Sequence, residues 1–225
     1  MRLILALTLL IFLGCKQQKD SGEKVTINGL EISKFLVDKI ESESGKRFEP
    51  LKRTIWKMDP KTENGFRQAD STVSGIQIPF VMDAKARKIV RDYLPKFSPL
   101  GHYIYLKNLD FDENFENSYY DIAVITCKDQ FELIEFVQTN GLNYDVTNED
   151  VIEKLKKWNS ECPFFIVAAY EDGIEADFIE LPKDLESFAK EVYQFCPDVI
   201  EQGVGSEEEL VKYFKTEKSF WLWWD

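Results

Sequence analysis

The last residues of the chain constrain its fold most strongly, because they form an aromatic strand without a polar face. Within residues 219–225, Phe220 and Leu222 alternate with Trp221 and Trp223, and successive side chains of a strand point to opposite faces. A strand that is apolar on both faces is normally an interior strand. The sequence therefore predicts that the N-terminal half of the chain covers the second face; the alternative is an exposed aromatic patch for a partner.

Two helices are predicted immediately before this strand. The first has an apolar stripe at three- and four-residue steps, made of Leu185, Phe188, Ala189, Val192 and Cys196. Pro197 ends this helix, because proline cannot continue the hydrogen-bond ladder. Ser206 and Glu209 form a capping-box pattern at the start of the second helix.

Several separated motifs in this half resemble the bacterial domain of unknown function 4253. They are FCPD at residues 195–198, EQG at 201–203 and LWWD at 222–225, with Asn143-Tyr144 and the LKKW of residues 155–158 upstream. The resemblance covers about the last half of the chain. It implies little about activity, since the family is named for having none assigned; some members are suspected of interaction or immunity-type roles.

The resemblance selects the residues expected at a functional site, which are Cys196, Asp198, Gln202, Trp223 and Asp225, followed by Trp158 and Asn143. One alternative is that Asp198 and Gln202 only satisfy backbone groups around Gly203 and Gly205. Another is an enzyme in which Asp198, Glu201 and Gln202 perform acid–base work beside the terminal tryptophans. No catalytic motif accompanies these residues, so an enzyme is not the favoured interpretation.

The segment from residue 117 to residue 225 predicts the order strand, helix, helix, strand, strand, helix, helix, strand. Residues 121–126 and 164–170 are apolar runs typical of inner strands, and Asp172-Gly173 is a hairpin turn. Thr147 and Asp150 form a capping box before the second helix. We expect an α+β fold with a four-stranded mixed or antiparallel sheet, helices on one face, and a split β-α-β arrangement with extra helices.

The N-terminus predicts a lipoprotein. Residues 1–14 contain one basic residue and an apolar run too short for an ordinary membrane span, and Gly14-Cys15 follows as in a lipobox. We therefore expect a signal peptide at residues 1–14, a lipidated Cys15 with a linker at 15–24, a smaller α+β segment at 25–116, and the family-like domain at 117–225. Lys16, in place of the aspartate that often retains lipoproteins in the inner membrane, favours the outer membrane.

The charge limits the possible partners. The chain has 28 basic and 40 acidic residues, a net charge of −12 that becomes −13 when Arg2 leaves with the signal peptide. Such a chain should not bind nucleic acid through its overall field, but it should attract a basic protein. The membrane is expected as a partner only through the lipid anchor. One helix face with Lys85, Arg87, Lys88 and Arg91 is interpreted as solvated.

Neither a cofactor nor a metal site is predicted. Asp110, Asp112 and Asn114 match the first three ligand positions of a calcium loop, and Asp121 falls at the twelfth. However, Phe115 occupies the position that needs glycine, and Asp121 replaces the bidentate glutamate. The three cysteines left after lipidation are Cys127, Cys162 and Cys196, an odd number that leaves one thiol free or paired with another molecule. Whether Cys162 and Cys196 form a disulfide depends on whether their elements adjoin, which the sequence alone does not decide.

These observations favour an envelope-anchored protein-interaction module, with an immunity-like role as one form of it. The alternatives are a carboxylate-based enzyme acting on an envelope or sugar substrate, and a structural lipoprotein.

Overall fold

The computed structural model describes residues 22–58, 61 and 66–225 of the chain. The predicted signal peptide at residues 1–14 and the lipidation site at Cys15 lie outside the described residues. Within the described ranges, no helix combines the length and the apolar character needed to cross a membrane.

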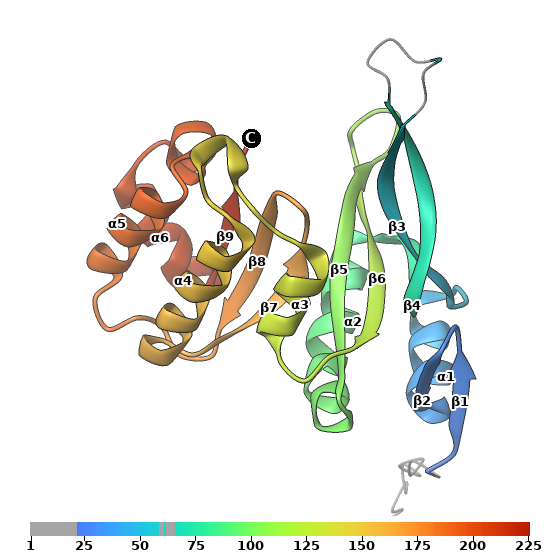
Figure 1. Cartoon of the computed structure of the whole chain (residues 1–225). Helices are drawn as coiled ribbons and strands as arrows, with labels where there is room; N and C mark the ends of the chain where they lie inside the picture. The colour runs from blue at the N-terminus through green and yellow to red at the C-terminus, as the bar shows by residue number, and fades with distance from the viewer. Residues whose placement is uncertain (1–21, 59–60, 62–65) are drawn as a thin grey trace, which may run out of the picture.

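The chain begins with a small hairpin and helix and continues into strands and helices in alternation (Figure 1). The elements before residue 117 are β1 (Lys24–Ile27), β2 (Leu30–Ser33), α1 (Lys34–Ser44), β3 (Glu49–Met58), β4 (Phe66–Met82), α2 (Asp83–Phe97), η1 (Ser98–Leu100) and β5 (His102–Phe111). The later elements are β6 (Ser118–Thr126), α3 (Gln130–Val137), η2 (Leu142–Tyr144), α4 (Asn148–Glu161), β7 (Phe164–Ala169), β8 (Gly173–Phe178), α5 (Leu185–Phe195), η3 (Val199–Val204), α6 (Glu207–Glu217) and β9 (Ser219–Trp223). The strands and α-helices of this second group follow the predicted order.

Seven of the described strands form one mixed sheet in the order β3-β4-β6-β5-β7-β8-β9, and β1 and β2 form a separate two-stranded sheet. The α+β prediction is confirmed, but the expected four-stranded sheet is wrong. The reason is that β5 lies between β6 and β7, antiparallel to β6 and parallel to β7 at the pair Leu106 and Ala168. The sheet therefore continues across residue 117, and the strands expected to form their own sheet are joined through β5.

Helices cover both faces of this sheet, contrary to the expectation of one covered face. The side chains of β8 alternate, so that Phe178 packs against Phe188 of α5 while Glu175 binds Arg87 of α2. Because neighbouring side chains of a strand point to opposite faces, α2 and α5 lie on opposite sides of β8. In Figure 1, α2 lies behind β5 and β6.

Local sequence determines several helix ends as predicted. At the start of α4, Thr147 Oγ1 accepts a hydrogen bond from the Asp150 backbone N–H, and the Asp150 carboxylate accepts one from Thr147 N–H. At the start of α6, Ser206 Oγ accepts from Glu209 N–H. These bonds satisfy donors that have no partner inside the first turn.

The terminal strand β9 lies at the edge of the sheet, so its predicted interior position is wrong. Phe220 and Leu222 are buried on one face, as expected for core residues, whereas Trp221 and Trp223 are half-buried on the other. The ring of Tyr213 from α6 packs edge-on against Trp221, with ring centroids 4.5 Å apart. The second aromatic face is therefore only partly covered, and it contributes to a cleft.

Candidate functional site

Most of the residues selected from the sequence meet at the C-terminus, around the buried carboxylate of Asp198. This side chain, in a residue only 1% exposed, lies between α5 and η3. Its Oδ1 accepts hydrogen bonds from the Tyr144 hydroxyl at 2.6 Å and from Gln202 Nε2 at 3.0 Å. Its Oδ2 accepts one from the Asp225 backbone N–H at 2.9 Å. The carboxylate thus joins η2, η3 and the end of the chain.

Two further predicted residues bind the same segment. The thiol of Cys196 donates to the Trp223 carbonyl at 3.0 Å, and its sulfur accepts from Trp223 N–H at 3.2 Å. Asn143 Nδ2 donates to the backbone carbonyl of Asp225. The structure therefore brings together Cys196, Asp198, Gln202, Trp223, Asp225 and Asn143.

Trp158 does not belong to this group. It is fully buried in the core, where its ring packs edge-on against Phe188, Phe195 and Phe220. Its indole N–H donates to Glu191 Oε2 at 3.1 Å. Trp158 is therefore a core residue with a satisfied polar group.

The chemistry around Asp198 is that of a structural anchor. Burial acts to raise the pKa of Asp198, but the hydrogen bonds from Tyr144, Asp225 and Gln202 outweigh it and hold the pKa below its ordinary value. Burial also raises the pKa of the Cys196 thiol to about 12, so that it stays protonated at neutral pH. A carboxylate saturated with donors is a poor proton donor, and this geometry does not favour an acid–base site.

A second candidate site is a cleft of about 970 Å³ where β5 diverges from β7. The two strands pair only at Leu106 and Ala168, after which β5 continues beside β6 while the chain turns from β7 into β8. One wall comes from β3 and β5, and the other from the β7–β8 turn and β9. No pattern in the sequence predicted this cleft.

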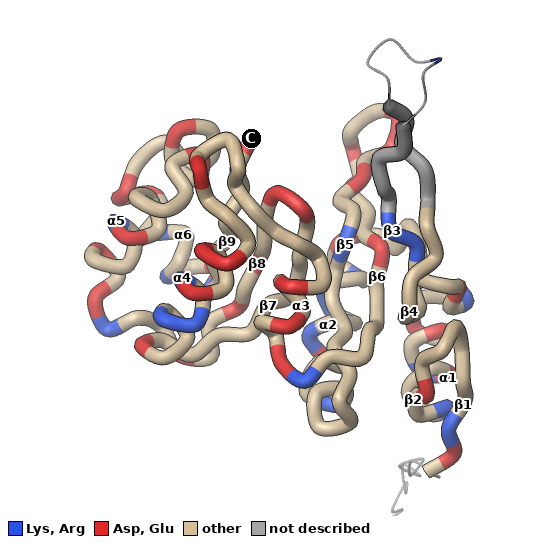
Figure 2. The backbone as a smooth tube through the Cα atoms, viewed as in Figure 1, with Lys and Arg blue, Asp and Glu red and all other residues tan. Residues whose placement is uncertain are grey.

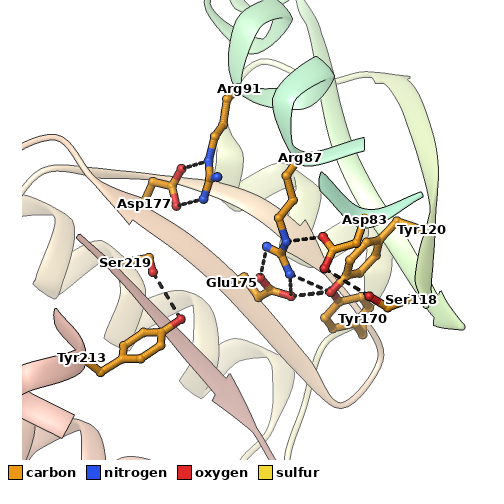
Figure 3. A network of polar contacts seen from close by, with 10 residues as sticks. All are labelled: Asp83, Arg87, Arg91, Ser118, Tyr120, Tyr170, Glu175, Asp177, Tyr213 and Ser219. Atoms are coloured by element: carbon orange, nitrogen blue, oxygen red, sulfur yellow. Dashed lines mark hydrogen bonds and ion pairs between the residues drawn. The ribbon is translucent and has the colours of Figure 1, made fainter. Parts of the chain in front are cut away.

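The floor of the cleft contains a network centred on Glu175 (Figure 3). Its carboxylate accepts hydrogen bonds from both terminal nitrogens of Arg87, from the Tyr120 hydroxyl at 3.0 Å and from the Tyr170 hydroxyl at 2.8 Å. Arg87 Nε also donates to Asp83 at 2.5 Å. Burial acts to raise the pKa of Glu175, but Arg87 and the two phenols outweigh it and lower the pKa. The pair is therefore ionised at neutral pH.

These contacts correct the interpretation of the basic face of α2 for its two arginines, whereas Lys85 and Lys88 are exposed as expected. Arg87 binds Glu175, and Arg91 binds Asp177 through two hydrogen bonds of 2.6 and 2.9 Å (Figure 3). The two arginines are four residues apart on a helix, and the two acids are two residues apart on a strand, so each pair lies on one face. This matching of spacing and charge was the only sequence pattern that could have indicated the contact.

The walls of the cleft have opposite charges. Lys107 and Arg53 lie on the β3–β5 wall, where Arg53 donates to the Val137 carbonyl at 3.3 Å. Glu171 and Asp172 lie in the opposite β7–β8 turn, where Asp172 accepts from the Trp223 indole at 3.3 Å. The cleft is therefore a dipolar site with aromatic side chains at its β9 end.

A third feature is the hairpin end that joins β5 to β6, which we call the β5–β6 tip. It comprises residues 109–117, and its apolar members Leu109, Phe111 and Phe115 are exposed. Phe115 is 79% exposed and adopts a φ of 57°, a left-handed conformation that a bulky side chain rarely takes. Figure 2 shows acidic residues on this hairpin.

The residues considered for calcium organise this turn. The Asp112 carboxylate accepts hydrogen bonds from Glu116 N–H at 2.8 Å and from Asn117 Nδ2 at 2.7 Å. Asp121 instead binds Phe80 N–H and Asn108 Nδ2, away from the loop. In the part of the chain that the structure describes, no group of three or more His, Cys, Asp or Glu residues is placed to hold a metal.

The three described cysteines, Cys127, Cys162 and Cys196, are buried free thiols. Burial raises the pKa of these thiols to about 12, 11 and 12, respectively. At neutral pH these thiols are therefore in their unreactive protonated form.

His102 binds the Glu31 backbone carbonyl through Nε2 at 3.0 Å.

Comparison with known proteins gives a family for part of the chain. Residues 121–225 match the family model described as Domain of unknown function (DUF4253). No curated protein and no solved structure matches the chain. The match begins within β6, and it includes the Asp198 contacts and the β7–β9 wall of the cleft.

Proposed function

We propose that this chain, whose residues 121–225 form a DUF4253 domain, is a lipid-anchored interaction module of the bacterial envelope that binds a basic protein partner at its β5–β6 tip. The observation on which this proposal depends is the exposure of Phe111 and Phe115, 45% and 79%, among four acidic residues of one hairpin end. The four acids are Asp110, Asp112, Glu113 and Glu116.

The exposed rings have no evident role in the fold. Phe111 and Phe115 contact each other with centroids 5.8 Å apart, yet both remain accessible to solvent. The left-handed backbone at Phe115 costs roughly 1–2 kcal/mol relative to a residue such as glycine. Aromatic side chains at the centre of an interface are common binding hot spots, and a rim of acids would orient a basic partner. The tip combines both properties.

The position of the tip suits an anchored protein. The described chain begins at Gly22 next to β1, at the end of the molecule opposite the tip (Figure 1). If Cys15 is lipidated, the chain is tethered at its β1 end, and the tip at the other end can meet a partner away from the membrane surface. We propose the outer membrane as the site of anchoring, from Lys16 after the modified cysteine. A secreted or envelope protein with a positive surface, including a toxin in the immunity-like form, fits this geometry.

Lipidation is tested by metabolic labelling with palmitate. The wild-type chain is expected to incorporate the label and to partition with membranes, because the lipobox cysteine receives the acyl chains. Cys15→Ser is expected to remove the label completely. A label that survives this substitution would place the modification elsewhere and contradict the anchor.

The interaction is tested by affinity capture with a tip variant. Immobilised residues 16–225 are expected to retain one envelope or secreted protein in near-equal amount at low salt and to release it as salt rises. The double variant Phe111→Ser/Phe115→Ser is expected to reduce capture about tenfold, in line with the loss of an aromatic hot spot. Its melting temperature should stay the same, because both rings are exposed.

Ile179→Ser is the matched control, because Ile179 is 63% exposed in the segment between β8 and α5, away from the tip. The control should retain the partner at the wild-type level. Equal capture by the tip variant and the wild type would refute the tip as the docking surface.

A further inference from the structure

We infer that the cleft between β5 and the β7–β8 turn binds a short peptide whose amino and carboxyl ends are both free. The cleft adjoins the tip at Leu109, but the inference concerns a small ligand held by other residues and does not depend on Phe111, Phe115 or the protein partner. Four properties of the cleft support it: its size, a stretch of β5 that β7 does not pair with, walls of opposite charge and an aromatic lining.

The size and the strand geometry suit an extended chain. A volume of about 970 Å³ lies within the range of small-ligand sites and accommodates a peptide of a few residues. After Leu106, β5 continues through Lys107, Asn108 and Leu109 without β7 beside it, and these three residues line the cleft. The side of β5 that faces β7 therefore has no β7 residue paired with it beyond Leu106, and strand addition at such a place is a recurring mode of peptide recognition.

The charges suit a zwitterion. On the β3–β5 wall, the Arg53 guanidinium can bind a carboxylate in a two-pronged geometry, because the one bond it makes to the Val137 carbonyl leaves further donors. The Lys107 ammonium, which donates to the Lys52 carbonyl and to Gln77 Oε1, adds positive charge to the same wall. On the opposite turn, the carboxylates of Glu171 and Asp172 can bind an ammonium group. Between the two walls, Arg87 and Glu175 form an ion pair whose opposite charges cancel, so the pair adds no net charge to the floor of the cleft. The cleft therefore selects a ligand with separated charges of opposite sign.

The aromatic side chains supply the contact area. Tyr170 on the floor and Tyr213, Trp221 and Trp223 towards β9 are half-buried and line the cleft. Tyr120, which is buried, supports the ring of Tyr170 by stacking at a centroid distance of 6.5 Å. Such rings offer large rigid surfaces at low conformational cost and accept peptide bonds or apolar side chains. The expected orientation places the peptide carboxylate near Arg53 and its amino group near Asp172.

The test uses the purified full-length chain in detergent and the tripeptide Ala-Phe-Ala in isothermal titration calorimetry. Four forms are compared: both ends free, N-acetylated, C-amidated, and capped at both ends. We expect the free form to bind best and each cap to weaken binding about tenfold, the equivalent of one lost charge-assisted contact.

Substitutions on the two walls assign each end of the peptide. Arg53→Gln should remove the preference for a free carboxylate while leaving the preference for a free amine. Glu171→Gln/Asp172→Asn should do the reverse, and the Asn-Gly pair that this variant places in the β7–β8 turn still favours a hairpin. Lys128→Gln and Glu153→Gln remove one charge each on exposed sites outside the cleft and should change neither preference.

Two results would overturn the inference. One is a failure of the free ends to matter, seen either as the same affinity for the free and the doubly capped peptide or as no binding of free Ala-Phe-Ala up to about 1 mM. The other is persistence of both end preferences in the two wall variants. If a wall variant fails to fold, as judged by its melting curve, the comparison of the four peptides on the wild type still decides the question.

Discussion

Arg87→Met is expected to lower the free energy of unfolding by about 3–5 kcal/mol at neutral pH, the usual cost of leaving a buried charge without its partner. In the folded protein, Arg87 donates two hydrogen bonds to Glu175 and one to Asp83, and it also donates to the Tyr120 hydroxyl at 2.8 Å. Both side chains of the main pair are about three-quarters buried. Methionine replaces the length of the stem but none of these bonds.

The pH dependence of this loss has a defined sign. In the wild type the pKa of Glu175 is lowered, so its contribution is present above the unfolded pKa and lost as pH falls through the folded pKa. Without Arg87, burial raises the pKa of Glu175, and protonation relieves the unpaired charge. The difference between variant and wild type should therefore shrink from pH 7 to pH 4. Urea denaturation at both values measures it.

The double variant Arg87→Met/Glu175→Leu is the control. It removes both charges, so we expect it to recover much of the lost stability. A double variant as unstable as Arg87→Met alone would show that the loss came from packing and not from the unpaired carboxylate. Arg91→Met should have a smaller effect, because Arg91 is 44% exposed.

Asp198→Asn is expected to cost about 1.5–3 kcal/mol, the range for hydrogen bonds to a charged group. Three donors face the two oxygens of Asp198, and an amide would direct its own N–H groups at one of these donors. The pKa of Asp198 is lowered in the fold, so the wild-type advantage should exist above about pH 4 and disappear as the carboxylate protonates below it. Denaturant unfolding at pH 7 and pH 3 checks this.

The same variant separates a structural role from a binding role. If Asp198 only anchors the chain end, Asp198→Asn should melt earlier but retain its captured partner below its melting temperature. Lost capture with unchanged melting would instead place Asp198 in a binding site. Gln202→Ala removes one of the three donors and should give a smaller loss of stability in the same direction.

Local sequence patterns predicted the structure correctly where the contacts that fix it join residues close in the sequence. Thr147 and Asp150 bind each other's backbone within one helical turn. At α6 one half of the predicted capping box forms, since Ser206 Oγ accepts from Glu209 N–H. In β8, Ile174, Ala176 and Phe178 alternate with Glu175 and Asp177, and this local pattern matches the buried and half-buried positions of the strand. The gathering of Asp198, Gln202 and Asp225 was anticipated by the family resemblance and not by a physical argument. Tyr144 belongs to the separate Asn143-Tyr144 motif of this resemblance, which gave no reason to expect the bond from its hydroxyl to Asp198.

The pairing of distant segments required the tertiary structure. The sequence by itself determined an α+β fold, the order of elements after residue 117 and an acidic surface, because these follow from periodicity, capping and composition. Only the tertiary structure decided that β5 lies between β6 and β7, that Arg87 meets Glu175, and that β9 forms an edge. The side chains of a strand alternate between its two faces whichever strand lies beside it, so the sequence of β5 does not indicate that β7 is its neighbour. The cleft arises where that one pairing ends, and it therefore has no local sequence pattern of its own.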